Sequence, residues 1–420
     1  MFEMNFMRNK LFSEMEYTAM EHKFYHMLYL AFAQIKGLEL KNLQLNMTAQ
    51  DLEQLYNISK FHGTTALVYD ALVQIPLKQI LISADDEECR NVFHRFKQTE
   101  EKSIRKNLLM DGERAKLFAY MKEHHIWYMP LKGVILKDLY PKIGERQMVD
   151  NDILFDQNYQ KQIRSYFVSQ GYKVVSYNRG NHDVYVKNPI YNFEMHTSLY
   201  GVQSKKGWIQ YYEHIIDKLE SKDGVEYHFK TEDFYIYFMS HAYKHYDISG
   251  IGLKFLLDLY VFLEHYEKQM DWNYVAAEIQ KLNMTAFERN SRQLLLSLNN
   301  SIDEIYHREE HSLKTISSYI ESHLEKQYLE MLAYICNSGS HGTVKNRVEN
   351  KVKLYEHVKH PKLHYYVKKS FPDYTFMKIK YPRIAKYKIL LPIAWIYRGI
   401  DALIHHPKKI FQDIKWTWKI

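Results

Sequence analysis

The sequence predicts an α+β protein in which a small mixed β-sheet is flanked by N-terminal and C-terminal helical regions. Two observations predict this class. Apolar residues recur every three or four positions through residues 16–125, and again from Thr231 to about Tyr334, as in helices with one buried face. Between these stretches the pattern alternates with period two, as in strands with one buried face.

Four regions follow from these patterns, and a chain of 420 residues is long enough for two or three domains. The region of mixed pattern is expected to fold as a strand, a helix, a strand, a helix, a hairpin and a strand. The regions are residues 1–105, an N-terminal helical region; 106–230, a mixed α/β core; 231–340, a second helical region; and 341–420, a basic C-terminal tail.

Composition is that of an ordinary soluble globular protein, with 46% hydrophobic and 25% charged residues. No apolar run approaches the ~20 residues that span a bilayer, so no transmembrane segment is expected. The N-terminus mixes acidic and apolar residues and lacks the apolar stretch of a secretory signal. Two cysteines, Cys89 and Cys336, argue against a disulfide framework and favour a reducing compartment, so we expect a cytoplasmic protein.

Charge is distributed unevenly along the chain. The net charge is +7, but residues 341–420 hold 18 Lys and Arg against 5 Asp and Glu, a balance of +13, which leaves −6 for the rest. Such a tail can contact an anionic partner, namely phosphates, nucleic acid or an anionic membrane surface. A solvated basic face on helices that pack back onto the body is the alternative.

Two acidic residues in the second expected strand suggest a cation site. Residues i and i+2 of a strand point to the same face, so Asp150 and Asp152 are expected to project together while Asn151 faces the core. Adjacent carboxylates repel each other unless one is protonated or both share a cation. A divalent cation that prefers oxygen ligands, Mg²⁺ or Mn²⁺, is the usual partner.

A third acid lies on a later strand. In YNFEMHT the same alternation puts Glu194 and His196 on one face. If this strand neighbours the aspartate strand, Glu194 joins the pair. Three acids on adjacent strands can hold two metal ions ~3.5–4 Å apart, an arrangement suited to in-line displacement at phosphorus.

Basic residues precede the aspartates. Lys132 and Gly133 open an expected helix, whose N-terminal N–H groups attract phosphate while the glycine lets it approach the backbone. Arg146, in the loop before the aspartate strand, is placed to neutralise phosphate oxygens.

These motifs resemble a known family. PLKGVILKDLYPKIGERQMVDNDILF is similar to the uncharacterised nucleotidyltransferase family of the polymerase-beta-type superfamily, which reads Leu-Lys-Gly, a helix ending in Tyr-Pro, then Arg-x-x-x-Asp-x-Asp. NFEMH resembles that family's Glu-x-His strand, and HAYKHYDISGIGLKFLLDLYVF resembles its helical segment. The resemblance covers about residues 110–270.

The resemblance implies a nucleotidyltransferase core at residues 106–230 and a nucleotide- or substrate-binding helical region at 231–340. It implies Mg²⁺ or Mn²⁺ as cofactor and a nucleoside triphosphate as co-substrate. By position, the resemblance assigns metal binding to Asp150 and Asp152, and makes Glu194 a third metal ligand or the general base. It assigns Lys132 and Gly133 to the phosphates, and Lys254 and Asp258 to the nucleotide.

Histidines elsewhere are weaker candidates. His241 and His245 share a helix face with Lys244 beside them, but a zinc site needs a third ligand at a suitable spacing, and none is evident. A substrate-facing role for these residues and His196 stays open beside a packed helix face. His182 stands at an expected hairpin, where turn chemistry is the favoured interpretation.

The sequence therefore predicts a metal-dependent nucleotidyltransferase that moves a nucleoside monophosphate to an unidentified acceptor: a sugar phosphate, a small metabolite, a protein or RNA. One alternative is a D-x-D glycosyltransferase that uses a nucleotide sugar, although that class needs a Rossmann-like region where this chain is expected to be helical. The other is a non-catalytic relative that binds nucleotide or acts as an interaction module.

Overall fold

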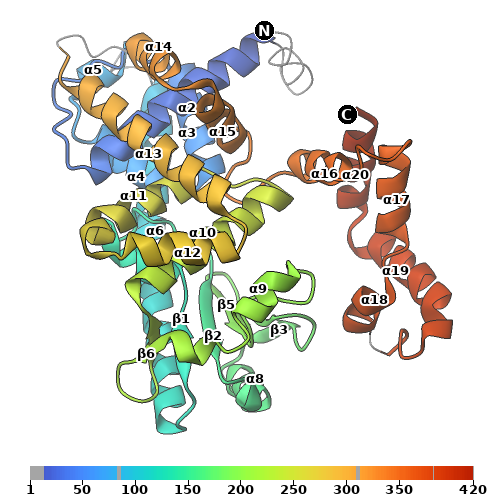
Figure 1. Cartoon of the computed structure of the whole chain (residues 1–420). Helices are drawn as coiled ribbons and strands as arrows, with labels where there is room; N and C mark the ends of the chain where they lie inside the picture. Colours follow the sequence, from blue (N-terminus) through green and yellow to red (C-terminus); the bar gives the residue numbers. More distant parts are fainter. Residues whose placement is uncertain (1–13, 83–86, 309–312, 382, 420) are drawn as a thin grey trace. The chain divides into compact units, whose positions relative to one another are not determined.

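A computed structural model describes residues 14–82, 87–308, 313–381 and 383–419 (Figure 1). The chain forms two compact units, each assembled from three separate segments. The first unit comprises the residues up to 114, residues 132–149 and residues 251–341, and the second comprises residues 115–131, 150–250 and 342–420.

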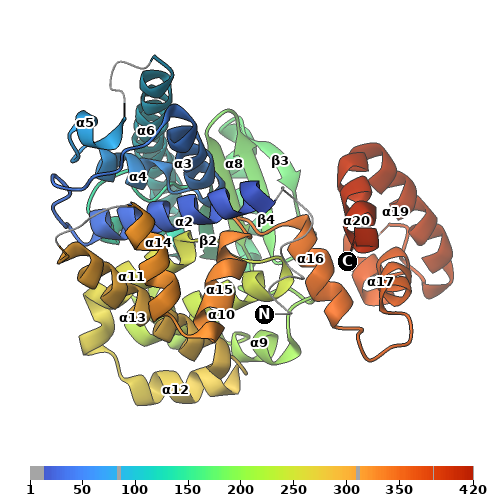
Figure 2. The same ribbon diagram turned by 90° about the horizontal axis from the view of Figure 1, so that it is seen from above.

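The described part of the first unit is helical. Helices α2, α3, α4, α13 and α14 lie together in both views (Figures 1 and 2). Its elements are α2 (Glu14–Ile35), α3 (Ala49–His62), α4 (Thr65–Leu72), α5 (Leu77–Ile80), α6 (Glu87–Glu123) as far as residue 114, α7 (Gly133–Leu136), η1 (Lys137–Leu139), α11 (Lys254–Tyr266), η4 (Glu267–Gln269), α12 (Trp272–Lys281), α13 (Thr285–Tyr306), α14 (Leu313–His323) and α15 (Lys326–Cys336).

Two local features show how the sequence starts and anchors these helices. Helix α3 begins with a capping box, in which Thr48 and Asp51 satisfy each other's backbone N–H groups. At its other end the buried His62 contacts the carbonyl oxygen of Cys336 through Nε2, at 3.2 Å, and accepts from the Leu253 N–H at 3.1 Å. His62 thus joins three distant stretches of the first unit.

The second unit is built on a five-stranded mixed sheet in the order β1-β2-β5-β4-β3. Strands β2 and β5 pair in parallel, and the other neighbours pair antiparallel. The strands are β1 (Tyr128–Pro130), β2 (Asn151–Phe155), β3 (Lys173–Ser176), β4 (His182–Lys187) and β5 (Tyr191–His196).

One face of this sheet is the hydrophobic core of the second unit. Ile153, Phe155, Tyr185, Phe193 and Met195 are buried there with residues of the last turns of α6 and of α8 (Gln160–Ser169). Because side chains alternate along a strand, the residues between these positions lie on the other face. The remaining elements between residues 157 and 250 are η2 (Gln157–Tyr159), α9 (Lys206–Tyr211), η3 (Ile215–Lys218), the hairpin of β6 (Leu219–Ser221) and β7 (Tyr227–Phe229), and α10 (Thr231–Ile248).

The basic tail of the second unit folds into short helices with two small cores, one of Val348, Val352 and Tyr365 and one of Met377, Ala385 and Ala394. Its elements are α16 (Val344–Lys353), α17 (Pro361–Ser370), α18 (Tyr374–Lys380), η5 (Lys388–Leu390), α19 (Leu391–His405) and α20 (Pro407–Lys419).

The α+β class and the order of elements in the mixed region are confirmed. Within the helical pattern of residues 16–125, residues 87–123 form one long helix, α6. One boundary was wrong: β2 begins at Asn151, so Asp150 precedes the strand. The backbone just before Asp150 bonds to lysine side chains. Lys106 Nζ donates to the carbonyl of Val149, and Lys254 Nζ donates to the carbonyl of Gln147.

Among the described residues, no helix is both long enough and apolar enough to cross a membrane.

Candidate functional site

The sheet places an acid of β2 directly beside an acid of β5. In the parallel register, Asp152 pairs with Glu194 and Leu154 with His196. Both acids are partly exposed, whereas Ile153 and Met195, on the opposite face, are buried. The expectation that these two strands are neighbours is therefore confirmed, and Asn151 is fully buried, as its place on the strand predicts.

His196 connects the two carboxylates. Its Nε2 lies 2.8 Å from Oδ1 of Asp152 and 4.0 Å from Oε2 of Glu194. The imidazole is buried, and its Nδ1 has no hydrogen-bond partner among the described residues. A histidine held by an aspartate in this way keeps one orientation, so its Nε2 stays on the polar face.

His182 completes the cluster, and sequence reasoning missed it. It is the first residue of β4, opposite His196 in the register, and its Nε2 lies 3.6 Å from Oε2 of Glu194. One ligand atom from each of His182, Glu194 and His196 lies within 4.8 Å of the others. The residue that stabilises the turn is its neighbour Asp183, whose Oδ1 accepts a hydrogen bond from the Asn178 N–H at 2.7 Å. The alternation of His182 with Val184 and Val186 could have indicated that His182 belongs to the strand.

Helix α10 contributes the weaker candidates. Its Tyr237 is buried, and burial together with the charge of Asp152 raises the pKa of the phenol well above its ordinary value, so the phenol stays neutral. One turn further on, His241 and His245 lie with their Nε2 atoms 3.1 Å apart, and Lys244 Nζ is 5.8 Å from the ring centre of Tyr200, which follows β5.

Asp150 lies in the second unit, immediately before β2, and is partly exposed.

The first unit holds a second polar group around Arg146 and Asp258, both buried. Nε and one terminal nitrogen of Arg146 each donate to a different oxygen of the Asp258 carboxylate at 2.8 Å. The hydroxyl of Tyr140 donates to the same carboxylate at 2.8 Å. Burial, and secondarily the charge of Asp258, raises the pKa of Tyr140 well above its ordinary value, which keeps this donor protonated. Breaking a buried pair of this kind typically costs ~3–5 kcal/mol of folding free energy.

Arg146 also packs against the turn at Lys132 and Gly133. Its other terminal nitrogen lies 3.4 Å from the carbonyl oxygen of Gly133, and a Cβ on Gly133 would lie 2.7 Å from that nitrogen. Lys132 has φ 32° and ψ −100°, a conformation that non-glycine residues rarely adopt and that clusters at functional sites. Arg146 thus contacts both the Asp258 carboxylate and the turn at Gly133. Direct contact of Arg146 and Asp258 with a nucleotide stays a prediction.

The predicted site residues thus fall into two groups. Asp150, Asp152, Glu194, His196, His241, Lys244 and His245 belong to the second unit, and Lys132, Gly133, Arg146, Lys254 and Asp258 belong to the first.

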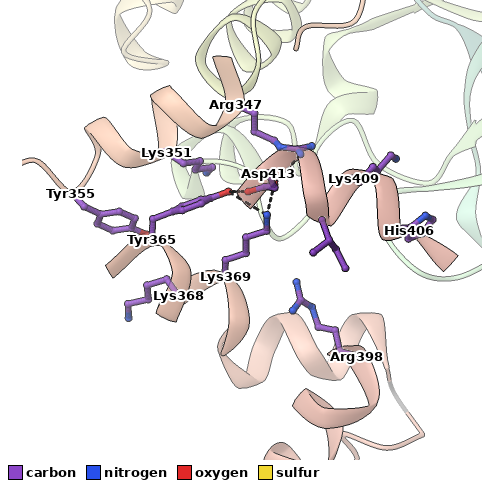
Figure 3. Close-up of a pocket in the computed structure, with 11 residues that line it drawn as sticks. Arg347, Lys351, Tyr355, Tyr365, Lys368, Lys369, Arg398, His406, Lys409 and Asp413 are labelled. Carbon is purple, nitrogen blue, oxygen red and sulfur yellow. Dashed lines mark hydrogen bonds and ion pairs between the residues drawn. The ribbon is translucent and has the colours of Figure 1, made fainter. Parts of the chain in front are cut away.

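The tail contains a cavity of about 490 Å³ lined mainly by cations (Figure 3). Its single lining acid, Asp413, is buried and accepts from the Tyr365 hydroxyl at 2.7 Å and from Arg347 at 3.2 Å, and it also pairs with Lys369. Because one carboxylate faces so many cations, the cavity has a strong positive excess. The lining cations are Arg347, Lys351, Lys368, Lys369, Arg398, Lys409 and, when protonated, His406.

Comparison with protein families identifies a family to which much of the chain is similar. The family model described as "Uncharacterised nucleotidyltransferase" matches residues 48–298, more than half of the chain. Comparisons with curated proteins and with solved structures gave no match. The match covers the sheet with Asp152, Glu194 and His196 as well as the turn held by Arg146 and Asp258. The chain belongs to the uncharacterised nucleotidyltransferase family.

Proposed function

We propose that the chain is a metal-dependent nucleotidyltransferase that transfers a nucleoside monophosphate from a nucleoside triphosphate to an acceptor and releases pyrophosphate. The observation that carries this proposal is the parallel pairing of β2 and β5, which puts Asp152 beside Glu194 with His196 between them. Membership of a nucleotidyltransferase family supports the reaction class.

The donors on the polar face of the sheet suit a divalent cation. Asp152 and Glu194 supply carboxylate oxygens, which Mg²⁺ and Mn²⁺ prefer. We assign Asp150 as a further ligand of the same ions. The imidazoles of His182 and His196 lie beside the Glu194 carboxylate and suit Mn²⁺ better than Mg²⁺. When bound, such an ion supplies Lewis-acid stabilisation of the charge on the phosphate oxygens.

The chain's own residues would bind, orient and move protons. The acceptor hydroxyl gives its proton to the Glu194 carboxylate as its oxygen forms the bond to the α-phosphorus, and the bond from that phosphorus to the departing pyrophosphate breaks. His196, held by Asp152, fixes the orientation of the acid cluster. Lys132 and Gly133 bind the phosphates, and Arg146 with Asp258 positions that turn. Lys254 contacts the nucleotide, and His241, Lys244 and His245 face the substrate.

The acceptor is a sugar phosphate, a small metabolite, a protein or RNA. The glycosyltransferase alternative is disfavoured, because the described residues 14–82 and 87–127 contain helices and no strand of a Rossmann-like region before β1.

The test is label transfer. Each α-labelled triphosphate is incubated with the full chain, Mg²⁺ or Mn²⁺, and cell extract as the source of acceptors. Transfer is expected from one or more triphosphates and should be abolished in Asp150→Ala/Asp152→Ala. Asp156→Ala is the matched control, since Asp156 follows the other end of β2 and only caps the next helical turn at Asn158. Transfer that persists in the double variant, or a non-catalytic wild type that only binds nucleotide, would refute the proposal.

A further inference from the structure

Helix α19 presents its apolar face outward. Five aliphatic side chains are between 52% and 67% exposed, while Ala394 is fully buried on another side of the helix. Their spacing of three, four, three and one residues puts them on one face. They are Ile393, Ile396, Ile400, Leu403 and Ile404.

Helix α20 repeats the arrangement with aromatic residues. Phe411 and Trp418 are 71% and 78% exposed, and the exposed Ile414 lies between them at helical spacing. Lys408 and Lys415 are three residues before and four residues after Phe411, so lysines flank this apolar face. A helix with Trp and Phe on one face and Lys beside it is typical of helices that lie in a membrane interface.

Helix α19 carries apolar side chains on its outward face as well as on the face that packs in the tail. The core beside α19 consists of Met377, Ala385 and Ala394, and Leu391 and Trp395 of α19 pack against it, whereas the isoleucines of α19 lie outside. Exposed apolar area of this extent is unfavourable in water and is typical of a surface that binds a partner or a membrane. At 15 and 13 residues, α19 and α20 are shorter than the ~20 residues needed to cross a bilayer, but both can lie in its plane.

The positive charge of the tail distinguishes among the possible partners of this apolar face. Residues 341–420 carry a balance of +13, and the cavity in Figure 3 shows how densely these cations gather. Two copies with this charge would repel each other, which disfavours a dimer through this face. A nucleic acid would pair with the cations but would leave the isoleucines in water. A negatively charged lipid surface satisfies both features, because its headgroups attract the lysines and its acyl layer accepts the apolar side chains.

We propose that α19 and α20 anchor the protein to anionic membrane surfaces, with the apolar face of both helices inserted among the lipid chains. The enzyme would then act on acceptors at, or delivered to, a membrane surface. The anchoring does not depend on the proposed transfer reaction, and its test uses binding alone.

The experiment is flotation of the full chain with vesicles of phosphatidylcholine, and with vesicles of phosphatidylcholine and phosphatidylglycerol at a ratio of about 7:3, at low and high salt. Wild type should bind the anionic vesicles at least tenfold more tightly at low salt, with the preference shrinking as salt rises. Ile396→Ser/Ile400→Ser and Phe411→Ser/Trp418→Ser should each weaken binding at least tenfold. Lys408→Glu/Lys415→Glu should weaken binding to the anionic vesicles only.

Matched controls use residues outside the tail. Val168→Ser/Leu296→Ser removes two exposed aliphatic side chains, and Lys161→Glu/Lys268→Glu reverses two exposed lysines; both should bind like wild type. All substituted side chains are exposed, so circular dichroism should show unchanged folding. Equal binding to both vesicle types, or binding that survives the apolar variants, would overturn the proposal. The proposal would also be overturned if the protein does not bind vesicles and instead forms a concentration-dependent dimer. The same holds if it does not bind vesicles but binds pyrophosphate or short RNA through Lys351 and Lys409.

Discussion

The sheet of the second unit and the helices of the tail use apolar residues in opposite ways. In the sheet, Phe193 and Met195 face a core and the polar Glu194 between them faces outward. In α19, Ala394 and Trp395 face a core, but isoleucines on the other side of the helix face outward. The sheet therefore buries its apolar face and exposes polar residues, whereas α19 leaves an apolar face exposed. The proposed chemistry uses the polar face of the sheet, and the proposed membrane contact uses the apolar face of the tail.

Truncating one apolar residue in each region should give the largest contrast. Phe193→Ala should destabilise the protein by ~3–5 kcal/mol, because the ring is buried against Phe167 and Tyr172 with centroids 5.2 and 5.7 Å away. Ile400→Ala should change the free energy of unfolding by no more than ~0.5 kcal/mol, since its side chain is half exposed. Urea unfolding measures both. A large loss of unfolding free energy in Ile400→Ala would show that the Ile400 side chain is packed within the folded protein, and the two regions would then not differ in this respect.

Changing one polar group of the sheet should affect activity without a comparable loss of stability. Asp152→Asn keeps the shape of the side chain but removes its charge beside His196 and Glu194. Transfer should fall by about 10²–10³-fold, the range for losing one group that stabilises developing charge. Steady-state rates with the responsive triphosphate measure this, with Asp156→Asn as control. Equal losses in both variants would place the effect in folding rather than in the site.

Buried ionisable groups of the first unit should make the folding stability depend on pH, which the exposed lysines of the tail cannot do. Burial raises the pKa of Glu145 to about 7, although Gln34 Nε2 donates to its carboxyl group at 2.7 Å. The folded state therefore binds more protons than the unfolded state between pH ~4.5 and ~7, so stability is lost as pH rises through this window. Burial lowers the pKa of His62 to about 4, and stability is lost as pH falls from ~6.5 to ~4.

Glu145→Gln separates these opposing contributions. Relative to wild type, the variant should gain on the order of 3 kcal/mol as pH rises from ~4.5 to ~7.5, because only the wild type must ionise a buried carboxyl group. Denaturant unfolding at a series of pH values measures the difference, and the contribution of His62 cancels from it. Parallel pH profiles for the two proteins would mean that Glu145 titrates normally.

The sequence predicted the parts of the site that depend on local periodicity. Alternation identified the faces of Asp152 and Glu194, and the order of elements predicted a compact mixed core. It could not predict the pairing of Arg146 with Asp258, which joins residues 112 positions apart and depends on tertiary packing. It missed His182 because a strand that starts next to a hairpin looks like part of the turn. It did not single out the isoleucine spacing of α19, and whether that face points in or out is a property of the fold.

The smallest predicted effect compares one glycine from each region. Gly133→Ala should cost about 1 kcal/mol of stability, because its Cβ would lie 2.7 Å from a terminal nitrogen of Arg146, which must shift away from its bonds. Gly399→Ala, in the middle of α19, should instead stabilise by ~0.5–1 kcal/mol. Beyond the adjoining residues and backbone of its own helix, no described atom lies within 4 Å of the new Cβ, and alanine favours helix more than glycine. Thermal unfolding of the two variants should therefore shift in opposite directions. Destabilisation by Gly399→Ala as well as by Gly133→Ala would show that the new Cβ in α19 meets other atoms of the folded chain, and would contradict the exposure of this part of the helix.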